Sequence, residues 1–272
     1  RIVRVISQPR GNMLLVGVGG SGRQSLSRIA AWLCQLSTFQ IEITKNYRTG
    51  EFKEDLKGLY HSTGVRDAPT SFLFNDTQIV EENFLEIISN VLSSGEIANL
   101  FKNEEFDEIR NTLMDVAKRY GVVPTPEAMY SFFIERVRSN LHIVLCMSPI
   151  GESFRVRLRQ YPALINYMTI DWFMDWPKDA LLEVANKFLL TVDMLDTITG
   201  EPREYDEKQY IGTTKQEVLQ QSVAMIFATI HDSVSQYSRT MLLEMRRHNY
   251  VTPTNYLELV TGYKHEPDEP RV

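Results

Sequence analysis

A glycine-rich run near the start of the chain has the composition of a loop that binds phosphate. Residues 17–25 read Gly-Val-Gly-Gly-Ser-Gly-Arg-Gln-Ser, after the apolar run 13–16 and before a helical repeat of apolar residues. Strand, glycine loop and helix in this order form a P-loop, in which backbone N–H groups and the helix N-terminus point at a polyphosphate. We therefore expect nucleotide phosphates to be bound by Gly17, Gly19, Gly20, Ser21, Gly22, Arg23, Gln24 and Ser25.

Two positions of this loop depart from the usual pattern G-x-x-x-x-G-K-[ST]. Arg23 stands where lysine is expected, and Gln24 stands where a hydroxyl would meet Mg²⁺. Ser25 is one residue too late, and on a helix one residue turns a side chain by about 100°. The run fits nucleotide binding better than hydrolysis, and the alternative is a tight turn that binds nothing.

Asp76 ends an apolar run, 71–76, about 50 residues after the loop. A carboxylate at that place could hold Mg²⁺ directly or through water, and the alternative is a role in capping the strand or the next helix. The following residue is Thr77, which cannot act as a base at neutral pH, and Glu81 and Glu82 lie a helical turn further on. Arg23 could pair with phosphate oxygens as a forked donor, or it could fill an empty site by pairing with Asp76.

Three arginines follow the apolar run 141–147, at positions Arg155, Arg157 and Arg159. An arginine here could reach the nucleotide of a neighbouring subunit and stabilise charge in phosphoryl transfer. The alternative is a solvated basic surface.

The composition is that of an ordinary globular protein, with 43% hydrophobic and 24% charged residues among 272. The formal net charge of −6 argues against nucleic acid or an anionic membrane as the main partner. No apolar run approaches the ~20 residues that span a bilayer. Cys34 and Cys146 lie in apolar stretches, which is typical of free thiols in a reducing compartment.

Apolar runs and helical repeats alternate along the first part of the chain. Strands are predicted at 13–17, 41–44, 71–76, 141–147 and 169–172, and the helices between them include 22–36, 51–63, 102–120 and 126–139. This alternation predicts an α/β fold, a parallel sheet with helices on both faces and a ligand beyond the carboxyl ends of the strands. Helices without strands follow at 178–190, 214–238 and 252–261. We expect a large α/β domain at 1–175, a small helical domain at 176–264 and an irregular tail at 265–272.

Several runs together resemble an AAA+ module, and more narrowly the fourth AAA+ module of an axonemal dynein heavy chain. The resemblance covers about residues 1–263, and its runs are LVGVGGSGRQSL at 15–26, FLFNDTQI at 72–79, CMSPIG at 146–151, FRVRLR at 154–159, IDWF at 170–173, WP at 176–177 and TPTNYLEL at 252–259.

The resemblance implies a large α/β subdomain and a small helical subdomain within a ring of six modules. It makes 17–25 the Walker A loop and Asp76 the Walker B carboxylate and metal ligand. It places Met147 or Ser148 at the sensor-1 position, and it makes Arg155, Arg157 and Arg159 candidates for an arginine finger that serves the preceding module.

The family also implies ATP or ADP as ligand, with Mg²⁺ possible, and a location in the cytoplasm, in the axoneme of a cilium or flagellum. The implied partners are neighbouring modules of the same heavy chain. A microtubule would be reached only through a stalk, which the family places after the small subdomain and which we expect to be absent from residues 1–272.

The hypothesis is a regulatory module of a microtubule motor that binds ATP or ADP and hydrolyses it slowly or not at all. One rival is an active ATPase with non-standard catalytic residues. The other is a nucleotide-free structural spacer of the ring. The missing acidic residue after Asp76 favours the regulatory module over the enzyme, and the intact loop glycines favour it over the spacer.

Overall fold

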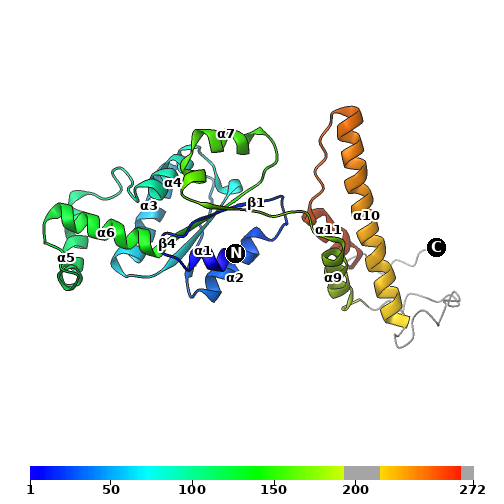
Figure 1. The fold of residues 1–272 in the computed structure, drawn as a ribbon, viewed down its shortest axis with the longest axis horizontal. Helices are drawn as coiled ribbons and strands as arrows, with labels where there is room; N and C mark the ends of the chain where they lie inside the picture. Colours follow the sequence, from blue (N-terminus) through cyan, green and yellow to red (C-terminus); the bar gives the residue numbers. More distant parts are fainter. Residues whose placement is uncertain (193–214, 265–272) are drawn as a thin grey trace. The chain divides into compact units, whose positions relative to one another are not determined.

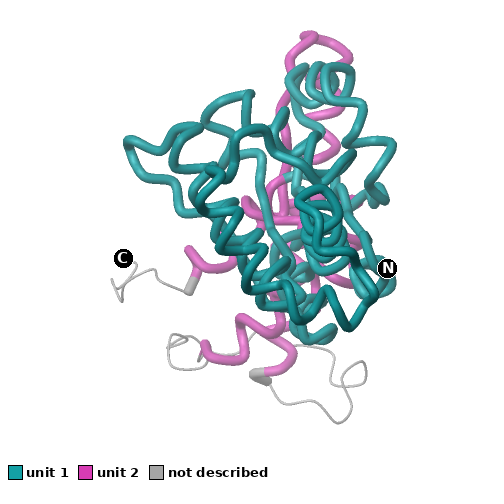
Figure 2. The backbone as a smooth tube through the Cα atoms, turned by 90° about the vertical axis from the view of Figure 1, so that its left-hand side faces the viewer, with its two compact units in different colours: residues 1–18, 22–173 teal, residues 19–21, 174–272 magenta. Residues whose placement is uncertain are grey.

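The computed structural model describes residues 1–192 and 215–264. Contacts divide the chain into two compact units, coloured separately in Figure 2: residues 1–18 with 22–173, and residues 19–21 with 174–272. The predicted irregular tail, 265–272, lies outside the described residues.

A five-stranded sheet organises the first unit, and every pairing in it is parallel. The strand order is β2-β3-β4-β1-β5, which confirms the predicted α/β fold (Figure 1). The strands are β1 Met13–Val16, β2 Ser37–Phe39, β3 Thr70–Asn75, β4 Leu141–Met147 and β5 Thr169–Trp172.

The prediction of a strand at 41–44 is wrong, because the second strand lies earlier, at Ser37–Phe39. Its residues pair with Thr70–Phe72 of β3. The alternation of Ile41 and Ile43 suggested a strand, but Ile41 is buried in the core and Ile43 is exposed without ladder pairing among the described residues. Hydrogen bonding to β3 determines where the second strand lies, and the alternation of side chains in the sequence does not reveal this bonding.

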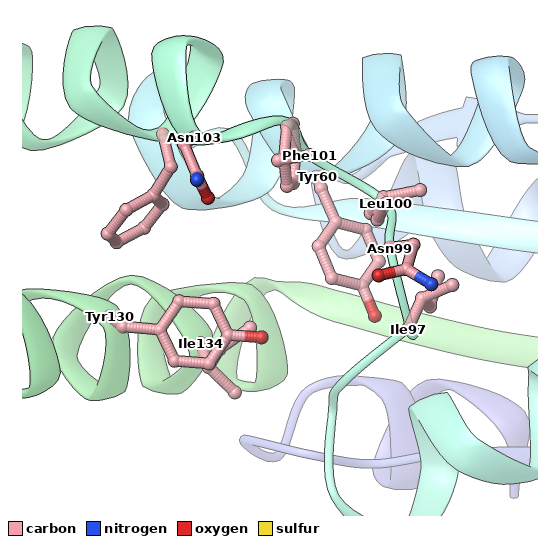
Figure 3. Close-up of a pocket in the computed structure, with 9 residues that line it drawn as sticks. Tyr60, Ile97, Asn99, Leu100, Phe101, Asn103, Tyr130 and Ile134 are labelled. Carbon is pink, nitrogen blue, oxygen red and sulfur yellow. The ribbon is translucent and has the colours of Figure 1, made fainter.

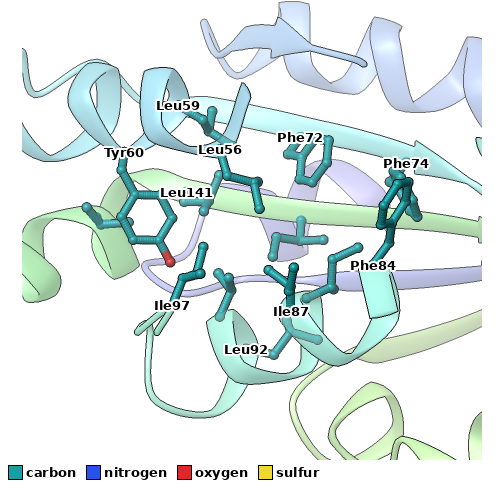
Figure 4. Close-up of a cluster of buried hydrophobic side chains, with 14 of the residues drawn as sticks. Leu56, Leu59, Tyr60, Phe72, Phe74, Phe84, Ile87, Leu92, Ile97 and Leu141 are labelled. Atoms are coloured by element: carbon teal, nitrogen blue, oxygen red, sulfur yellow. The ribbon is translucent and has the colours of Figure 1, made fainter. Parts of the chain in front are cut away.

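Alternate residues of the central strands enter two different hydrophobic cores. Leu14 and Val16 face one core, whereas Met13 and Leu15 face the other. Helix α1 (Ile2–Ile6) and helix α2 (Arg23–Leu33) cover the second of these faces. The larger core, part of which is shown in Figure 4, is built from the other helices of this unit.

The helices that supply this larger core follow the predicted order, with shifted ends. They are α3 Thr49–Tyr60, α4 Asn83–Ser93, α5 Asn103–Arg119, α6 Pro126–Asn140, α7 Glu152–Gln160 and α8 Ala163–Asn166, with the π-helical turn η1 His61–Val65 and the 3₁₀ turn η2 Asp76–Gln78. Helix α6 starts as its sequence suggests: the Thr125 side chain accepts a hydrogen bond from the Ala128 N–H, and Pro126 occupies the first turn.

Helix α2 is amphipathic in an unusual sense. Its buried residues are the small ones, Ser27, Ala30 and Ala31. The large apolar residues Leu26, Ile29, Trp32 and Leu33 are exposed. Small side chains let the helix lie close to the sheet, which fixes the position of its N-terminus.

Three helices form the core of the second unit: α9 Lys178–Leu189, α10 Lys215–Met245 and α11 Pro253–Lys264. Leu181 and Ala185 of α9 pack with Phe227 of α10 and Tyr256 of α11. The Tyr256 hydroxyl also donates to the Leu181 carbonyl oxygen, over 2.7 Å. The predicted helix 214–238 extends to Met245. None of the described helices is long and apolar enough to cross a membrane.

Phe84 of α4 offers a test of the larger core. Its side chain is 0% exposed and stacks on Phe52 of α3, with ring centroids 4.4 Å apart. We expect Phe84→Ala to lower the free energy of unfolding by about 3–5 kcal/mol, because it removes buried area and leaves a cavity. Trp32→Ala, at a ring that is 76% exposed, should change it by less than about 1 kcal/mol. Urea unfolding followed by circular dichroism measures both, and equal losses would contradict the core assignment.

Candidate nucleotide-binding site

The predicted phosphate loop connects β1 to α2 at the carboxyl end of the sheet. The Gly17 N–H donates to the Met147 carbonyl oxygen over 3.1 Å, which ties the start of the loop to the end of β4. Gly22 has φ +89° as the N-cap residue of α2, and Gly20 has φ +77°. A side chain is strained in this left-handed region, so the loop needs glycine at both positions.

The contacts of the loop residues separate them into two groups. Gly19, Gly20 and Ser21 belong with the second unit, and Gly17, Gly22, Arg23, Gln24 and Ser25 belong with the first. Gln24 and Ser25 are exposed on the first turn of α2.

Arg23 holds its guanidinium against the loop. Its Nη2 donates to the Val18 carbonyl oxygen over 3.3 Å. Its Nη1 is buried and has no hydrogen-bond partner among the described residues, which also contain no ion pair between Arg23 and Asp76 within 4.0 Å. The alternative in which Arg23 pairs with Asp76 is therefore wrong. A buried donor left unpaired costs about 1–3 kcal/mol, so this nitrogen suits an anionic oxygen.

Asp76 begins the turn η2 directly after β3, and its Oδ2 accepts a hydrogen bond from the Ser148 N–H over 2.8 Å. The predicted Walker B and sensor-1 positions thus meet at the same edge of the sheet. Of the two sensor-1 candidates, Met147 has its side chain in the core, and Ser148 contacts the carboxylate. The Ser148 Oγ accepts from the Ile150 N–H over 3.3 Å.

Sequence reasoning missed Asn75 and Gln78, two buried polar residues that flank Asp76. The Gln78 side chain accepts from the Asn75 N–H over 2.9 Å and donates to the Ile41 carbonyl oxygen over 2.7 Å. The Asn75 Oδ1 is buried with no partner among the described residues. The sequence signal that could have identified them is a pair of amide residues on either side of a carboxylate at a strand end. Their hydrogen bonds fix the direction in which the chain leaves β3.

The pKa of the Cys146 thiol depends on its burial and on the charges of the site. Burial raises the pKa of its thiol to about 12, while the positive charge of Arg23 lowers that pKa and the negative charge of Asp76 raises it. The thiol therefore stays neutral at physiological pH.

The residues of this site fit a phosphate better than a magnesium ion. The amide of Gln24 replaces the hydroxyl ligand, and one oxygen of Asp76 already accepts from Ser148. The buried free Nη1 of Arg23, in contrast, is suited to an anion.

The acidic residues that could replace a catalytic glutamate are held by other partners. Glu81 accepts from the Thr49 hydroxyl and pairs with Arg48, 3.6 Å away. Glu82 accepts two hydrogen bonds from Arg157 at its Oε1, 2.7 Å from Nη2 and 3.1 Å from Nε. Thr77 is exposed in η2. Both glutamates therefore have other partners, and the residue directly after Asp76 carries no carboxylate.

Helix α7 separates the three candidate arginines. Successive alternate residues of a helix are turned by about 200°, so Arg155 and Arg159 share a face and Arg157 points the other way. Arg155 and Arg159 are exposed, and Arg155 lies 3.8 Å from Glu152. Arg157 is only 18% exposed and is bound to Glu82 of its own unit.

A separate cavity of about 270 Å³ shares no lining residue with this site. Figure 3 shows its mixed aromatic and amide lining, and the lining residues are Tyr60, Ile97, Asn99, Leu100, Phe101, Asn103, Phe106, Tyr130 and Ile134. It contains none of the residues predicted to bind phosphate.

The bonds between Arg157 and Glu82 can be measured by a double-mutant cycle. We expect the two groups to contribute a coupling energy of about 1 kcal/mol, which is larger than for a typical surface pair because the contact is bidentate and Arg157 is mostly buried. Urea unfolding of Arg157→Ala, Glu82→Ala and the double variant provides the value. Arg155 and Glu152, an exposed pair one helical turn apart, form the matched control and should couple by less than about 0.5 kcal/mol. Equal coupling in both cycles would contradict the geometry.

Comparison with known proteins places the chain among the dyneins. The family described as P-loop containing dynein motor region D4 matches residues 1–265. The chain is 56% identical over 264 residues to dynein axonemal heavy chain 2 of Mus musculus. It is 52% identical to the dynein-1-beta heavy chain of the flagellar inner arm I1 complex, and 42% identical to the dynein beta chain of the flagellar outer arm, both of Chlamydomonas reinhardtii.

Each of these matches covers 97% of this chain. The chain spans 6% of the mouse relative and 5% of the two algal relatives. The match over nearly the whole chain, together with the parallel sheet and its P-loop, shows that this chain belongs to the dynein motor family as an AAA+ D4 region of the axonemal heavy-chain type.

Proposed function

We propose that this chain is a regulatory nucleotide-binding module of an axonemal dynein heavy chain. It binds ATP or ADP at the loop 17–25, hydrolyses it slowly or not at all, and passes its nucleotide state to neighbouring modules of the same heavy chain. In this proposal residues 1–175 are the large subdomain, residues 176–264 are the small one, and the location is the axoneme of a cilium or flagellum. Contact with a microtubule is indirect, through parts of the heavy chain outside residues 1–272.

The observation that carries the binding proposal is the free donor of Arg23 beside the start of α2. Its Nη1 is buried and unpaired among the described residues, and the guanidinium is attached to the loop through Val18. The N-terminus of α2 adds the partial positive charge of the helix dipole. These features favour a bound polyphosphate over a nucleotide-free spacer.

The partners of the acidic residues support slow hydrolysis. Phosphoryl transfer needs a positioned metal, a group that orients water and added positive charge. Gln24 and Thr77 stand at two of these positions, and the nearby Glu81 and Glu82 are bound elsewhere. These features favour a regulatory module over an active ATPase.

The exposed face of α7 is proposed as the contact to the site of the preceding module. Arg155 and Arg159 are exposed and could reach another nucleotide, Arg155 after leaving its exposed pair with Glu152, whereas Arg157 is held by Glu82. The three residues are therefore not equivalent finger candidates, and loss of Arg159 should affect the preceding module of an intact motor rather than the nucleotide affinity of this one.

Nucleotide binding is tested by calorimetry with ATP and ADP. The unmodified chain should bind at least one of them, and Gly22→Ala should weaken binding at least tenfold because the alanine strains the left-handed N-cap position that begins α2. Gly50→Ala is the matched control, since a Cβ there meets nothing within 4 Å and its φ is not in the left-handed region. Absence of heat and of a thermal shift at millimolar nucleotide would refute the proposal.

Hydrolysis is tested by steady-state release of inorganic phosphate. We expect a rate well below about 1 s⁻¹, the lower end of the range for working enzymes. Thr77→Glu supplies a carboxylate next to Asp76 and should raise the rate, whereas Thr77→Gln, of similar size and uncharged, should not. Release near 1 s⁻¹ by the unmodified chain would instead support the active ATPase.

A further inference from the structure

The site has to balance the negative charge of a polyphosphate, and the usual means is Mg²⁺. A P-loop holds that ion through the hydroxyl that follows its lysine, with help from an acidic strand-end residue. This chain has Gln24 at the hydroxyl position, and Ser25, the next residue, is turned by about 100° on the helix. Asp76 is left as a single carboxylate, and one of its oxygens already accepts from the Ser148 N–H.

Arg23 supplies a different positive charge in the same place. Its guanidinium is always charged, planar and able to bind two phosphate oxygens at once. One nitrogen is anchored to the Val18 carbonyl oxygen at the start of the loop. The other terminal nitrogen is buried and unpaired within the part of the chain that the structure describes. The anchored side chain is thus already oriented before any ligand enters.

Asp76 leaves that guanidinium free. The two residues form no ion pair within 4.0 Å among the described residues. Both lie at the same end of β4: Arg23 donates to Val18, next to Gly17, whose N–H donates to Met147, and Asp76 accepts from Ser148. A phosphate beside Arg23 would therefore also experience the negative charge of Asp76, unless a cation were bound between them.

We propose that Arg23 takes the place of the magnesium ion, so that this module binds its nucleotide as the metal-free polyphosphate. The inference rests on the proposed nucleotide binding and specifies the form of ligand that the site accepts. In such a site Asp76 is not a metal ligand, and its charge opposes binding.

The experiment is a titration of the 272-residue chain with ADP and with ATP, in EDTA and in excess MgCl₂. We expect the dissociation constants in EDTA to be lower than those in MgCl₂, because excess Mg²⁺ converts the free nucleotide into its magnesium complex. Binding that is equally strong in MgCl₂, or that requires it, overturns this inference and leaves the proposed function intact. Absence of binding in both buffers overturns the proposed function, and this inference with it.

Three variants test the roles of the charges. Arg23→Ala should weaken binding in EDTA by about tenfold or more, because a charge-assisted bidentate contact is lost, and MgCl₂ should not restore it. Arg28→Ala is the matched control on the same helix, since Arg28 is exposed and bonds to the Gln40 side chain instead. The double change Arg23→Lys with Gln24→Thr restores the usual loop and should make binding stronger in MgCl₂ than in EDTA.

Asp76→Asn distinguishes binding of the metal-free nucleotide from binding of its magnesium complex, because the variant should change the affinity in opposite directions in the two cases. The amide oxygen can still accept from the Ser148 N–H, so the local fold is kept. Removing the charge should raise the affinity in EDTA, because Asp76 repels the phosphates. A loss of affinity that appears only in MgCl₂ would identify Asp76 as a metal ligand and overturn the inference. Thermal melting of each variant without nucleotide shows whether it is folded.

Discussion

Strand β4 lies between β3 and β1, and the register of these pairings determines where the site lies. Val16 lies opposite Met147, and Asn75 lies opposite Cys146. Because all three strands are parallel, the residues that follow them, Gly17, Asp76 and Ser148, emerge at one edge. The bonds from Gly17 to Met147 and from Ser148 to Asp76 then join the three strand ends. A shift of one residue in any of the three strands would turn its side chains to the opposite face and separate this group.

Most charged side chains around this edge of the sheet already have partners. The charged groups without partners determine which ligand the edge can bind. Glu81 is bound at the start of α3, and Glu82 is bound to Arg157 of α7. Arg23 keeps a free buried donor, and Asp76 keeps one carboxylate oxygen without a hydrogen-bond partner among the described residues. A free cationic donor, with both neighbouring glutamates held by other groups, supports the proposal of phosphate binding rather than phosphoryl transfer.

Glu82 also links the site to α7 by two routes. Its carboxylate binds Arg157, and its carbonyl oxygen accepts from the Tyr161 hydroxyl over 3.1 Å. Glu82 comes six residues after Asp76 in the chain, so the segment that carries the carboxylate also anchors the helix that presents Arg155 and Arg159. This segment therefore connects Asp76 to the helix with the exposed basic face, α7.

The sequence alone determined the class of fold and the identity of the loop. Apolar runs that alternate with helical repeats predicted the parallel sheet, and the glycine spacing at 17–22 predicted the turn before α2, because both depend on local backbone preferences. The resemblance to axonemal dyneins was likewise visible in short runs of sequence. The strand at 41–44 was misplaced because strand position depends on hydrogen bonding to a distant segment, 70–72.

Only the tertiary structure decided which charges pair. The sequence gives no reason to prefer one of the three arginines of α7, Arg155, Arg157 and Arg159. The helical turn and the position of Glu82 distinguish them in the structure. Arg23 had two possible partners in the sequence, and the structure leaves it unpaired with Asp76 and attached to Val18. Such pairings depend on distances between side chains that are far apart in the sequence. The packing of the strands and helices sets these distances, and no local sequence pattern contains them.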